Sequence, residues 1–309
     1  MRHIVCEVVK VYHVILAIIT IYSIVISFGF VSYSYSAYGQ VNETSQTNTY
    51  ENTSEEGSSF TFNVAGDFRH TPATGYNLVS DNPDFIIMTG DYGIKTDNAT
   101  EWTNSTMAMI KNSGIPVYGA LGNNDNGDDY LNTGFFTNKN WSYSFTKHNI
   151  AFVVADTEDE NVAETDALLA KAQNDPNVKW IIVLMHQSIW HPVGTSVSSD
   201  TTIDFHTTFK KYDKVKIVIA GHTHVYARMV PVDGILYIMN GIGGQNPSKG
   251  STETSTFSKI NGALHCSVAV NGSITCSNIS NGSGAIVDKF TIEANGTLPT
   301  DGTSVRPRH

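Results

Sequence analysis

Five short apolar segments of this chain each lead into a residue that can bind a metal ion. The segments span residues 61–65, 85–89, 117–121, 180–185 and 216–220, and they lead into Asp67, Asp91, Asn123, His186 and His222. In four of the five cases a single glycine precedes that residue, which lets the backbone turn sharply. In open α/β sheets, ligands bind beyond the carboxyl ends of the strands, so residues scattered in sequence can converge there. The pattern therefore predicts an α/β fold with one polar site at a sheet edge.

Residues 59–297 fit one α/β domain with a β-rich C-terminal end. Further strands are expected at 151–155, 235–240 and 288–293, and helices at 102–112, 164–173 and 203–212. Segments 141–146 and 150–155 are expected to pair as a hairpin. Asp97 or Thr100 is a candidate N-cap for the first helix. Strands that alternate with helices are typical of a single α/β domain.

The N-terminal segment predicts export. Arg2 and Lys10 precede residues 11–31, which are almost free of charge. A basic start followed by an apolar run is typical of a signal peptide. The run is also long enough to span a bilayer, so residues 1–39 are either a signal peptide or a membrane anchor. We expect a protein that is secreted or anchored to the outer face of the cell membrane, with any membrane association through residues 11–31.

Polar segments flank the expected domain. Residues 40–58, rich in Asn, Thr, Ser and Glu, are expected to form a linker, and residues 298–309 an unstructured tail. Potential N-glycosylation triplets agree with export and predict a glycoprotein. They begin at Asn42, Asn52, Asn98, Asn104, Asn140, Asn271, Asn278, Asn281 and Asn295.

The cysteine spacing predicts a disulfide. Cys6 lies in the leader, whereas Cys266 and Cys276 lie on either side of the hairpin dipeptide Asn271–Gly272. Residues that alternate in polarity flank this turn, so the two cysteines are expected opposite one another on paired strands. A disulfide there fits an oxidising compartment, and two buried free thiols are the alternative.

The charge of the chain excludes one class of partner. The net charge is −10, so the protein gains little from releasing counterions on DNA or RNA. Nucleic acid is therefore not expected as a general partner.

The side chains at the strand ends suit transition metals. Carboxylates, an amide oxygen and imidazoles bind Mn, Fe or Zn. Each motif alone is weak, because Gly-Asp and Gly-Asn-Asn-Asp are also common turn sequences. His222 and His224 occupy alternate positions of an extended stretch and face the same way. Five such features in succession, all at strand ends, point to a metal site.

The motif order resembles that of the calcineurin-like metallophosphoesterase superfamily. The matching residues are Gly66-Asp67, Gly90-Asp91, Gly122-Asn123-Asn124-Asp125, His186 and Gly221-His222-Thr223-His224. Residues 221–244 are most similar to the purple acid phosphatase branch, and the resemblance covers about residues 60–244. It implies a four-layer αββα sandwich of two mixed β-sheets, with a dinuclear metal centre at one edge.

The resemblance also implies roles for individual residues. Asp67 and His224 would hold one metal ion, Asp91 would bridge both ions, and Asn123, His186 and His222 would hold the second. A water activated by the two ions, which would be Mn, Fe or Zn, would attack phosphorus.

Two positions depart from the family pattern. Arg69 stands where the family has histidine or glycine, so His70 or Tyr92 is expected to turn towards the metals, or Arg69 to contact the substrate phosphate. Ile94 replaces the metal-binding tyrosine of purple acid phosphatases.

Asn124 replaces the family histidine that assists the leaving group, although Asp125, which orients that histidine in relatives, is retained. An amide donates hydrogen bonds but cannot transfer a proton. His191 or His206 is a candidate to supply the proton from another direction.

These features predict an exported, metal-dependent phosphohydrolase that cleaves small phosphate monoesters. Two alternatives remain open at this stage. One is a phosphodiesterase or nucleotide hydrolase on the same scaffold, and the other is a surface binding protein with impaired catalysis.

Overall fold

The computed structural model describes residues 58–69, 71–93, 98–159, 162–192, 204–246, 254 and 256–307. The expected leader and the linker up to residue 57 lie outside these residues, as does the candidate cap Asp97. Within the described part of the chain, no helix is both long enough and apolar enough to cross a membrane. All described residues belong to one compact unit, Ser54–His309.

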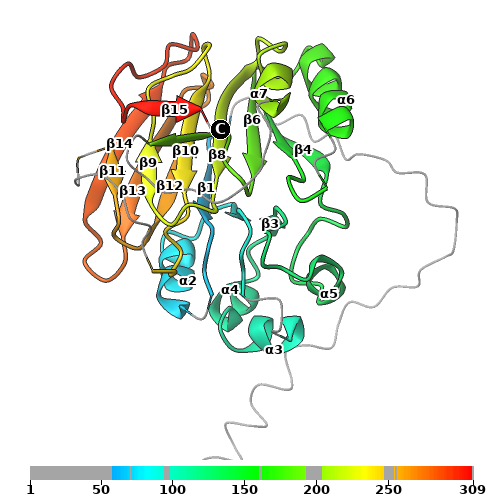
Figure 1. Cartoon of the computed structure of the whole chain (residues 1–309), viewed down its shortest axis with the longest axis vertical. Helices are drawn as coiled ribbons and strands as arrows, with labels where there is room; N and C mark the ends of the chain where they lie inside the picture. Colours follow the sequence, from blue (N-terminus) through cyan, green and yellow to red (C-terminus); the bar gives the residue numbers. More distant parts are fainter. Residues whose placement is uncertain are drawn as a thin grey trace, which may run out of the picture. The chain divides into compact units, whose positions relative to one another are not determined.

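The first sheet has six strands in the order β14-β13-β12-β1-β2-β3 (Figure 1). Strands β1, β2 and β3 are parallel, whereas β12, β13 and β14 form an antiparallel meander that joins the edge of β1. Their bounds are β1 Phe60–Ala65, β2 Phe85–Met88, β3 Val117–Gly119, β12 Gly262–Val268, β13 Ile274–Ser280 and β14 Ile286–Ile292.

The second sheet has seven strands in the order β11-β9-β10-β8-β6-β5-β4. Strands β5, β6, β8 and β10 are parallel, and antiparallel strands flank them on both sides. The bounds are β4 Tyr143–Lys147, β5 Ile150–Val154, β6 Trp180–Met185, β8 Val215–Ala220, β9 Tyr226–Arg228, β10 Leu236–Asn240 and β11 Phe257–Ser258.

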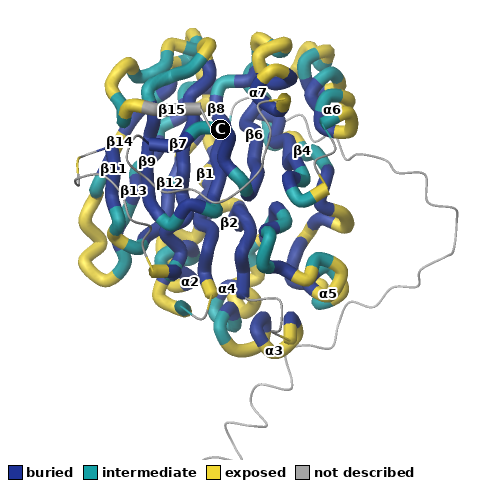
Figure 2. Tube along the Cα trace, in the orientation of Figure 1, coloured by how far each residue is buried: buried dark blue, intermediate teal, exposed yellow. Residues whose placement is uncertain are grey.

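The inner strands are apolar on both faces because each sheet is covered on both sides. In β5, Phe152 packs between the two sheets, and its neighbours Ala151 and Val153 face the helices on the other side. Alternate residues of a strand point to opposite faces, so a strand covered on both faces needs a continuous apolar run. Figure 2 shows the resulting buried strands within an exposed rim.

Helices cover the outer faces and complete the expected four-layer αββα sandwich. Helices α6 (Val162–Asn174) and α7 (Asp204–Phe209) pack on the second sheet. Helices α2 (Pro72–Val79), α3 (Ala99–Asn104), α4 (Ala108–Ser113) and α5 (Gly127–Asn132) pack on the first. The fold class and the single described domain are confirmed, and each expected strand lies within two residues of an observed one.

One expected helix is wrong in detail, because residues 102–112 form parts of two short helices. At the break, the Ser105 hydroxyl donates a hydrogen bond to the Glu101 carbonyl, a side-chain contact that competes with regular helix bonding. The N-cap of α3 is Asn98, whose side chain accepts a hydrogen bond from the Glu101 N–H, and not Thr100. Helices α2 and α5 were not expected.

The C-terminal region confirms one prediction and corrects another. Cys266 and Cys276 lie opposite one another in β12 and β13 and form a disulfide. The tail is not unstructured: β15 (Val305–Pro307) pairs antiparallel with β7 (Trp190–Pro192). Upstream of β15, Arg228 donates hydrogen bonds to the backbone and carboxylate of Asp301. These polar contacts order a segment that has few apolar residues.

Candidate metal centre

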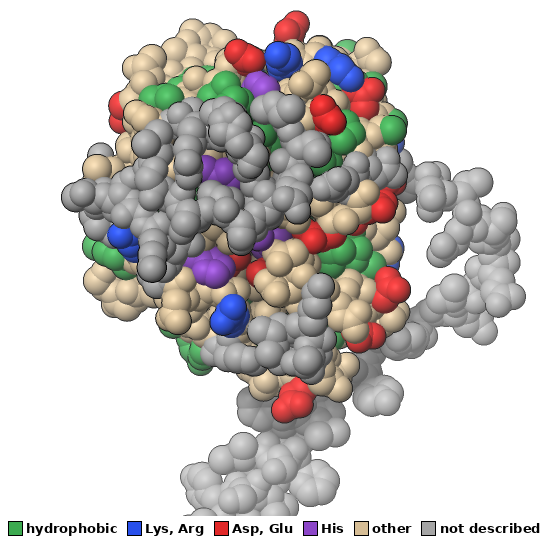
Figure 3. Space-filling view, in the orientation of Figure 1, with side chains coloured by type: hydrophobic (Ala, Val, Ile, Leu, Met, Phe, Trp, Pro, Cys, Tyr) green, Lys and Arg blue, Asp and Glu red, His purple; other side chains and the backbone are tan. Residues whose placement is uncertain are grey.

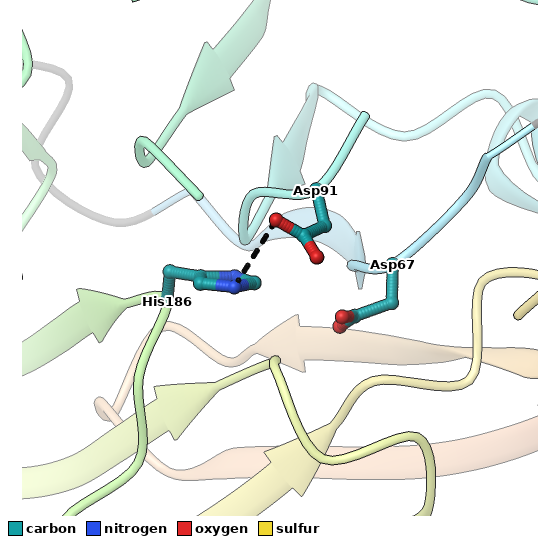
Figure 4. A group of neighbouring side chains, drawn as sticks. All are labelled: Asp67, Asp91 and His186. Atoms are coloured by element: carbon teal, nitrogen blue, oxygen red, sulfur yellow. Dashed lines mark ion pairs between the residues drawn. The ribbon is translucent and has the colours of Figure 1, made fainter. Parts of the chain in front are cut away.

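The strand ends bring the expected polar residues to one place, at the carboxyl edges of both sheets. Asp67, Asp91 and Asn123 follow β1, β2 and β3 of the first sheet, whereas His186 and His222 follow β6 and β8 of the second. Figure 4 shows Asp67, Asp91 and His186 pointing towards one another. Each of these three buried residues offers one ligand atom, and the three atoms lie within 4.8 Å of one another.

Three of these residues adopt the left-handed backbone conformation, which is unfavourable for residues other than glycine. The φ angles of Asp67, Asp91 and His222 are 62°, 51° and 68°. Such conformations cost about 1–3 kcal/mol each and cluster at functional sites. Gly122 has a related role, since a Cβ there would lie 2.2 Å from the Asp91 backbone nitrogen. These turns therefore position the side chains of the site, and their backbone conformations are locally unfavourable.

The orientation of His186 is fixed by its backbone partner. Its Nδ1 donates a hydrogen bond to the Thr89 carbonyl at 2.7 Å, because a carbonyl oxygen only accepts, and this contact directs Nε2 towards Asp91 and Asn123. That Nε2 lies 3.3 Å from Asp91 Oδ1 and 3.0 Å from Asn123 Oδ1. His222 Nδ1 approaches the same point, 2.9 Å from Asn123 Oδ1 and 3.3 Å from His186 Nε2.

Asp67 and His224 form a second part of the same site. His224 Nδ1 donates to the Asn246 carbonyl at 2.9 Å, and its Nε2 lies 3.5 Å from Asp67 Oδ1. That oxygen is buried and accepts no hydrogen bond from the part of the chain that the structure describes, whereas Asp67 Oδ2 accepts the His222 N–H. Burial lowers the pKa of His224, which favours the neutral ring. Burial raises the pKa of Asp67 well above its usual value, repulsion from Asp91 adds to the rise, and Arg69 opposes it.

This set of donor atoms fits a bound cation. An imidazole nitrogen lies near a carboxylate oxygen in two places, His186 Nε2 near Asp91 Oδ1 and His224 Nε2 near Asp67 Oδ1. Imidazole nitrogens and carboxylate oxygens are both common ligands of transition metals, so a cation at either place would be held by two suitable donors. Ligand atoms about 2.0–2.2 Å from one ion lie roughly 3 Å from each other, as observed around His186. The carbonyls that bind the far ring nitrogens act as outer partners that orient metal-binding histidines.

Asp125 holds the turns that carry the site. Its carboxylate accepts three backbone hydrogen bonds, from the N–H groups of Asp91 (2.9 Å), Tyr92 (2.8 Å) and Gly122 (2.9 Å). Burial raises the pKa of Asp125, repulsion from Asp91 adds to the rise, and the three N–H groups oppose it. These three partners of Asp125 are all backbone groups.

Asn124 lies against Asp91. Its backbone N–H donates to Asp91 Oδ1 at 2.9 Å, and its side-chain amide donates to Asp91 Oδ2 at 2.7 Å. The residue therefore binds a carboxylate of the candidate metal site through both of its donors.

The residues around Arg69 have mixed outcomes. Arg69 is exposed at the edge of the site with a φ angle of 47°, and its carbonyl accepts the Trp102 indole N–H. His70 and Ile94 lie outside the described residues. Tyr92 does not turn towards the site, because its ring is buried in the cluster under α3 and α5 and its hydroxyl donates to the Ala120 carbonyl. The expectation that Tyr92 is a ligand is wrong.

The two candidate proton donors have partners of their own. His206 is buried on α7, where its Nδ1 contacts the Tyr237 hydroxyl at 2.6 Å and its Nε2 contacts Asp233 at 3.0 Å. His191 is buried on β7 with its Nδ1 3.4 Å from the Thr223 hydroxyl.

Figure 3 shows histidine side chains gathered beside acidic ones near the middle of one face.

Two features of the site were missed from the sequence. The carbonyls of Thr89 and Asn246 orient His186 and His224, and backbone groups leave no signal in a sequence. Glu158 lies close enough to His186 and Asp91 for their charges to affect it, and it accepts a hydrogen bond from Gln187 at 2.7 Å. Its signal was present, because Glu158 belongs to an acidic turn that follows strand β5.

Comparisons with known proteins agree with this geometry. A family model described as calcineurin-like phosphoesterase matches residues 64–226, just over half of the chain. A search of curated proteins found no match.

Similar solved structures share the fold. One is described as "GAP50 the anchor in the inner membrane complex of Plasmodium", with a TM-score of 0.64, 17% identity, and coverage of 80% of this chain and 91% of that one. Purple acid phosphatase PPD1 from yellow lupin has a TM-score of 0.60 at 18% identity, and the match covers 76% of this chain and 54% of the lupin chain. A dimetal phosphatase from Danio rerio has a TM-score of 0.56 at 13% identity, and the match covers 76% of this chain and 99% of the Danio rerio chain.

Proposed function

Because the chain belongs to the calcineurin-like phosphoesterase family, we propose that it is a metal-dependent phosphohydrolase that cleaves small phosphate monoesters. One observation carries the proposal: the buried residues Asp67, Asp91 and His186 each offer a ligand atom within 4.8 Å of the others, and His186 Nε2 also lies 3.0 Å from Asn123 Oδ1. These oxygen and nitrogen donors suit Mn, Fe or Zn.

Six residues are proposed to hold two ions. Asp67 and His224 would hold the first ion, Asp91 would be shared by both, and Asn123, His186 and His222 would hold the second. When bound, such ions lower the pKa of a water and neutralise charge on phosphate oxygens.

The chain's own groups supply position and charge. The carbonyls of Thr89 and Asn246 accept from Nδ1 of His186 and His224 and keep Nε2 of both rings directed inward. Arg69, exposed at the edge, supplies positive charge that attracts a phosphate dianion in an otherwise acidic protein. Asp125 keeps the Asp91 and Gly122 turns together.

We also propose that the protein is exported. The Cys266–Cys276 disulfide supports this, because disulfides persist in oxidising compartments. The leader, which lies outside the described residues, is the expected signal or anchor.

The test combines activity with metal binding. We expect purified protein loaded with Mn²⁺ to hydrolyse 4-nitrophenyl phosphate, and Asp91→Ala and His222→Ala to lose turnover and calorimetric Mn²⁺ binding. Asp128→Ala, a change of an exposed carboxylate on α5, serves as the matched control and retains both. Full turnover by either site variant would overturn the proposal. Mn²⁺ binding without turnover would favour a binding protein instead.

A further inference from the structure

We propose that Asn124 is a positioning residue of the metal site, which fixes the carboxylate of Asp91, the ligand that both ions would share. The inference rests on the proposed function and adds to its metal site a residue that is not itself a ligand. It follows from what Asn124 contacts, from how the rest of Asp91 is held, and from the contrast with the neighbouring Asn123.

Asn124 gives both of its donors to one carboxylate. Its backbone N–H donates to Asp91 Oδ1 at 2.9 Å, and its side-chain amide donates to Asp91 Oδ2 at 2.7 Å. An ionised carboxylate only accepts, so the group that faces Oδ2 is the NH₂ of the amide. Hydrogen bonds to an ionised acceptor are among the stronger ones in proteins. One donor on each oxygen fixes the plane of the carboxylate, which a single hydrogen bond would leave free to turn.

The backbone of Asp91 is held by other groups. Its N–H donates to Asp125 Oδ2 at 2.9 Å, and its carbonyl accepts the Phe68 N–H at 2.9 Å. The residue is buried, with 1% of its surface exposed, and its φ angle is 51°. Since these contacts fix the main chain, the part of Asp91 that depends on Asn124 is the orientation of its side chain.

The two hydrogen bonds leave acceptor capacity for cations. An ionised carboxylate has about four lone-pair sites, and Asn124 uses one on each oxygen of Asp91. Sites on both oxygens therefore remain for metal ions. Carboxylates that bind metals are commonly oriented by hydrogen bonds from such outer partners.

The neighbouring Asn123 presents the opposite end of its amide to the site. Its Oδ1 lies 3.0 Å from His186 Nε2 and 2.9 Å from His222 Nδ1. An amide oxygen can bind a cation, whereas an amide NH₂ only donates hydrogen bonds. Two consecutive asparagines of one turn thus have different roles: Asn123 faces the imidazoles with its oxygen, and Asn124 faces the carboxylate with its nitrogen.

Calorimetric titration of the metal-free full chain with Mn²⁺ alone tests the role of Asn124. Asn124→Leu keeps the approximate size of the side chain but removes its donor. We expect Mn²⁺ affinity to fall by about 10–100-fold, the usual effect of losing an outer partner of a ligand. The loss should affect both ions, because Asp91 is the shared ligand. Asn124→Ala, which adds no bulk, should give the same loss if the leucine variant does not fold.

Asn124→His separates hydrogen bonding from packing. A neutral imidazole carries one N–H, so the variant changes the size of the side chain but keeps a donor. If Asn124 acts through its hydrogen bond, Asn124→His retains most of the Mn²⁺ affinity and Asn124→Leu does not. A residue that only fills space would give the reverse order.

Asn126 provides a matched control. Its amide also donates to a carboxylate, that of Asp129, but both residues are exposed at the start of α5. Asn126→Leu removes the same kind of hydrogen bond outside the site and should leave Mn²⁺ affinity unchanged.

Two results would overturn the inference alone. One is unchanged Mn²⁺ affinity in folded Asn124→Leu and Asn124→Ala, and the other is a loss in folded Asn124→His as large as that in Asn124→Leu. No Mn²⁺ binding by the unmodified protein would remove the proposed metal site, and the inference with it. Mn²⁺ binding without turnover of 4-nitrophenyl phosphate would remove the proposed reaction only. In that case, affinity that is lost in Asn124→Leu and kept in Asn124→His still supports the inference.

Discussion

Asp125 offers the sharpest test of how the fold supports the site, because one carboxylate serves three buried backbone donors. Oδ2 accepts from Asp91 and Gly122, and Oδ1 accepts from Tyr92. In Asp125→Ala all three N–H groups lose their acceptor. A buried donor without a partner costs about 1–3 kcal/mol, so the three together cost roughly 3–9 kcal/mol. We expect about 3–5 kcal/mol, since a water that enters the vacated space restores part of the bonding.

Asp125→Asn separates hydrogen bonding from charge. The amide oxygen can replace Oδ2, but the NH₂ group then faces the Tyr92 N–H, and one buried donor loses its partner. Removal of the charge also relieves the repulsion from Asp91. The expected loss is therefore smaller, about 1 kcal/mol.

Urea unfolding of the metal-free protein measures both variants, and calorimetry measures Mn²⁺ binding. Because the Asp91 turn loosens, Mn²⁺ affinity is expected to fall by about 10–100-fold in the alanine variant. Asp128→Ala, on the surface of α5, should change the free energy of unfolding by less than about 1 kcal/mol. An Asp125→Ala protein as stable as this control, with unchanged Mn²⁺ affinity, would refute the reasoning.

Three further predictions concern stability. Cys266→Ser opens a loop with a sequence separation of 10 and should lower the free energy of unfolding by about 2–3 kcal/mol in urea, an effect that reductant reproduces in the unmodified protein. Arg228→Leu leaves the buried carboxylate of Asp288 without its cation, with only the Tyr226 hydroxyl still donating to it, and should cost about 3–5 kcal/mol. Adding Asp288→Leu and Tyr226→Phe removes the buried charge and the hydroxyl together and should recover most of the loss in the same assay. In metal-free protein the raised pKa of Asp67 means that the folded state binds the proton more tightly than the unfolded state. The contribution of Asp67 to the free energy of unfolding therefore falls as pH rises from the usual pKa of 3.8 through the raised pKa. Thermal melts at a series of pH values measure this dependence, and Mn²⁺ should remove it. An equal dependence of the melting temperature on pH with and without Mn²⁺ would contradict the prediction.

The sequence by itself determined the strands of both sheets and predicted which polar residues lie together at their edge. Period-two alternation and continuous apolar runs are local properties, so strands such as β6 and β8 were placed within a residue of their ends. Ligands bind beyond the carboxyl ends of parallel strands, and this rule predicts that His186 and Asp91 lie close together, as they do in the structure. The hairpin turn between Cys266 and Cys276 likewise predicts that the two cysteines lie opposite one another on paired strands, as observed.

The tertiary structure alone decided which partner each side chain takes. Tyr92 faces an aromatic cluster and not the candidate metal site, and Asn124 donates to Asp91. The partners that orient His186 and His224 are backbone carbonyls from other loops. The tail is ordered by β7 and Arg228, far away in sequence. Local sequence fixes backbone periodicity, but these choices depend on long-range contacts that exist only once both sheets have packed.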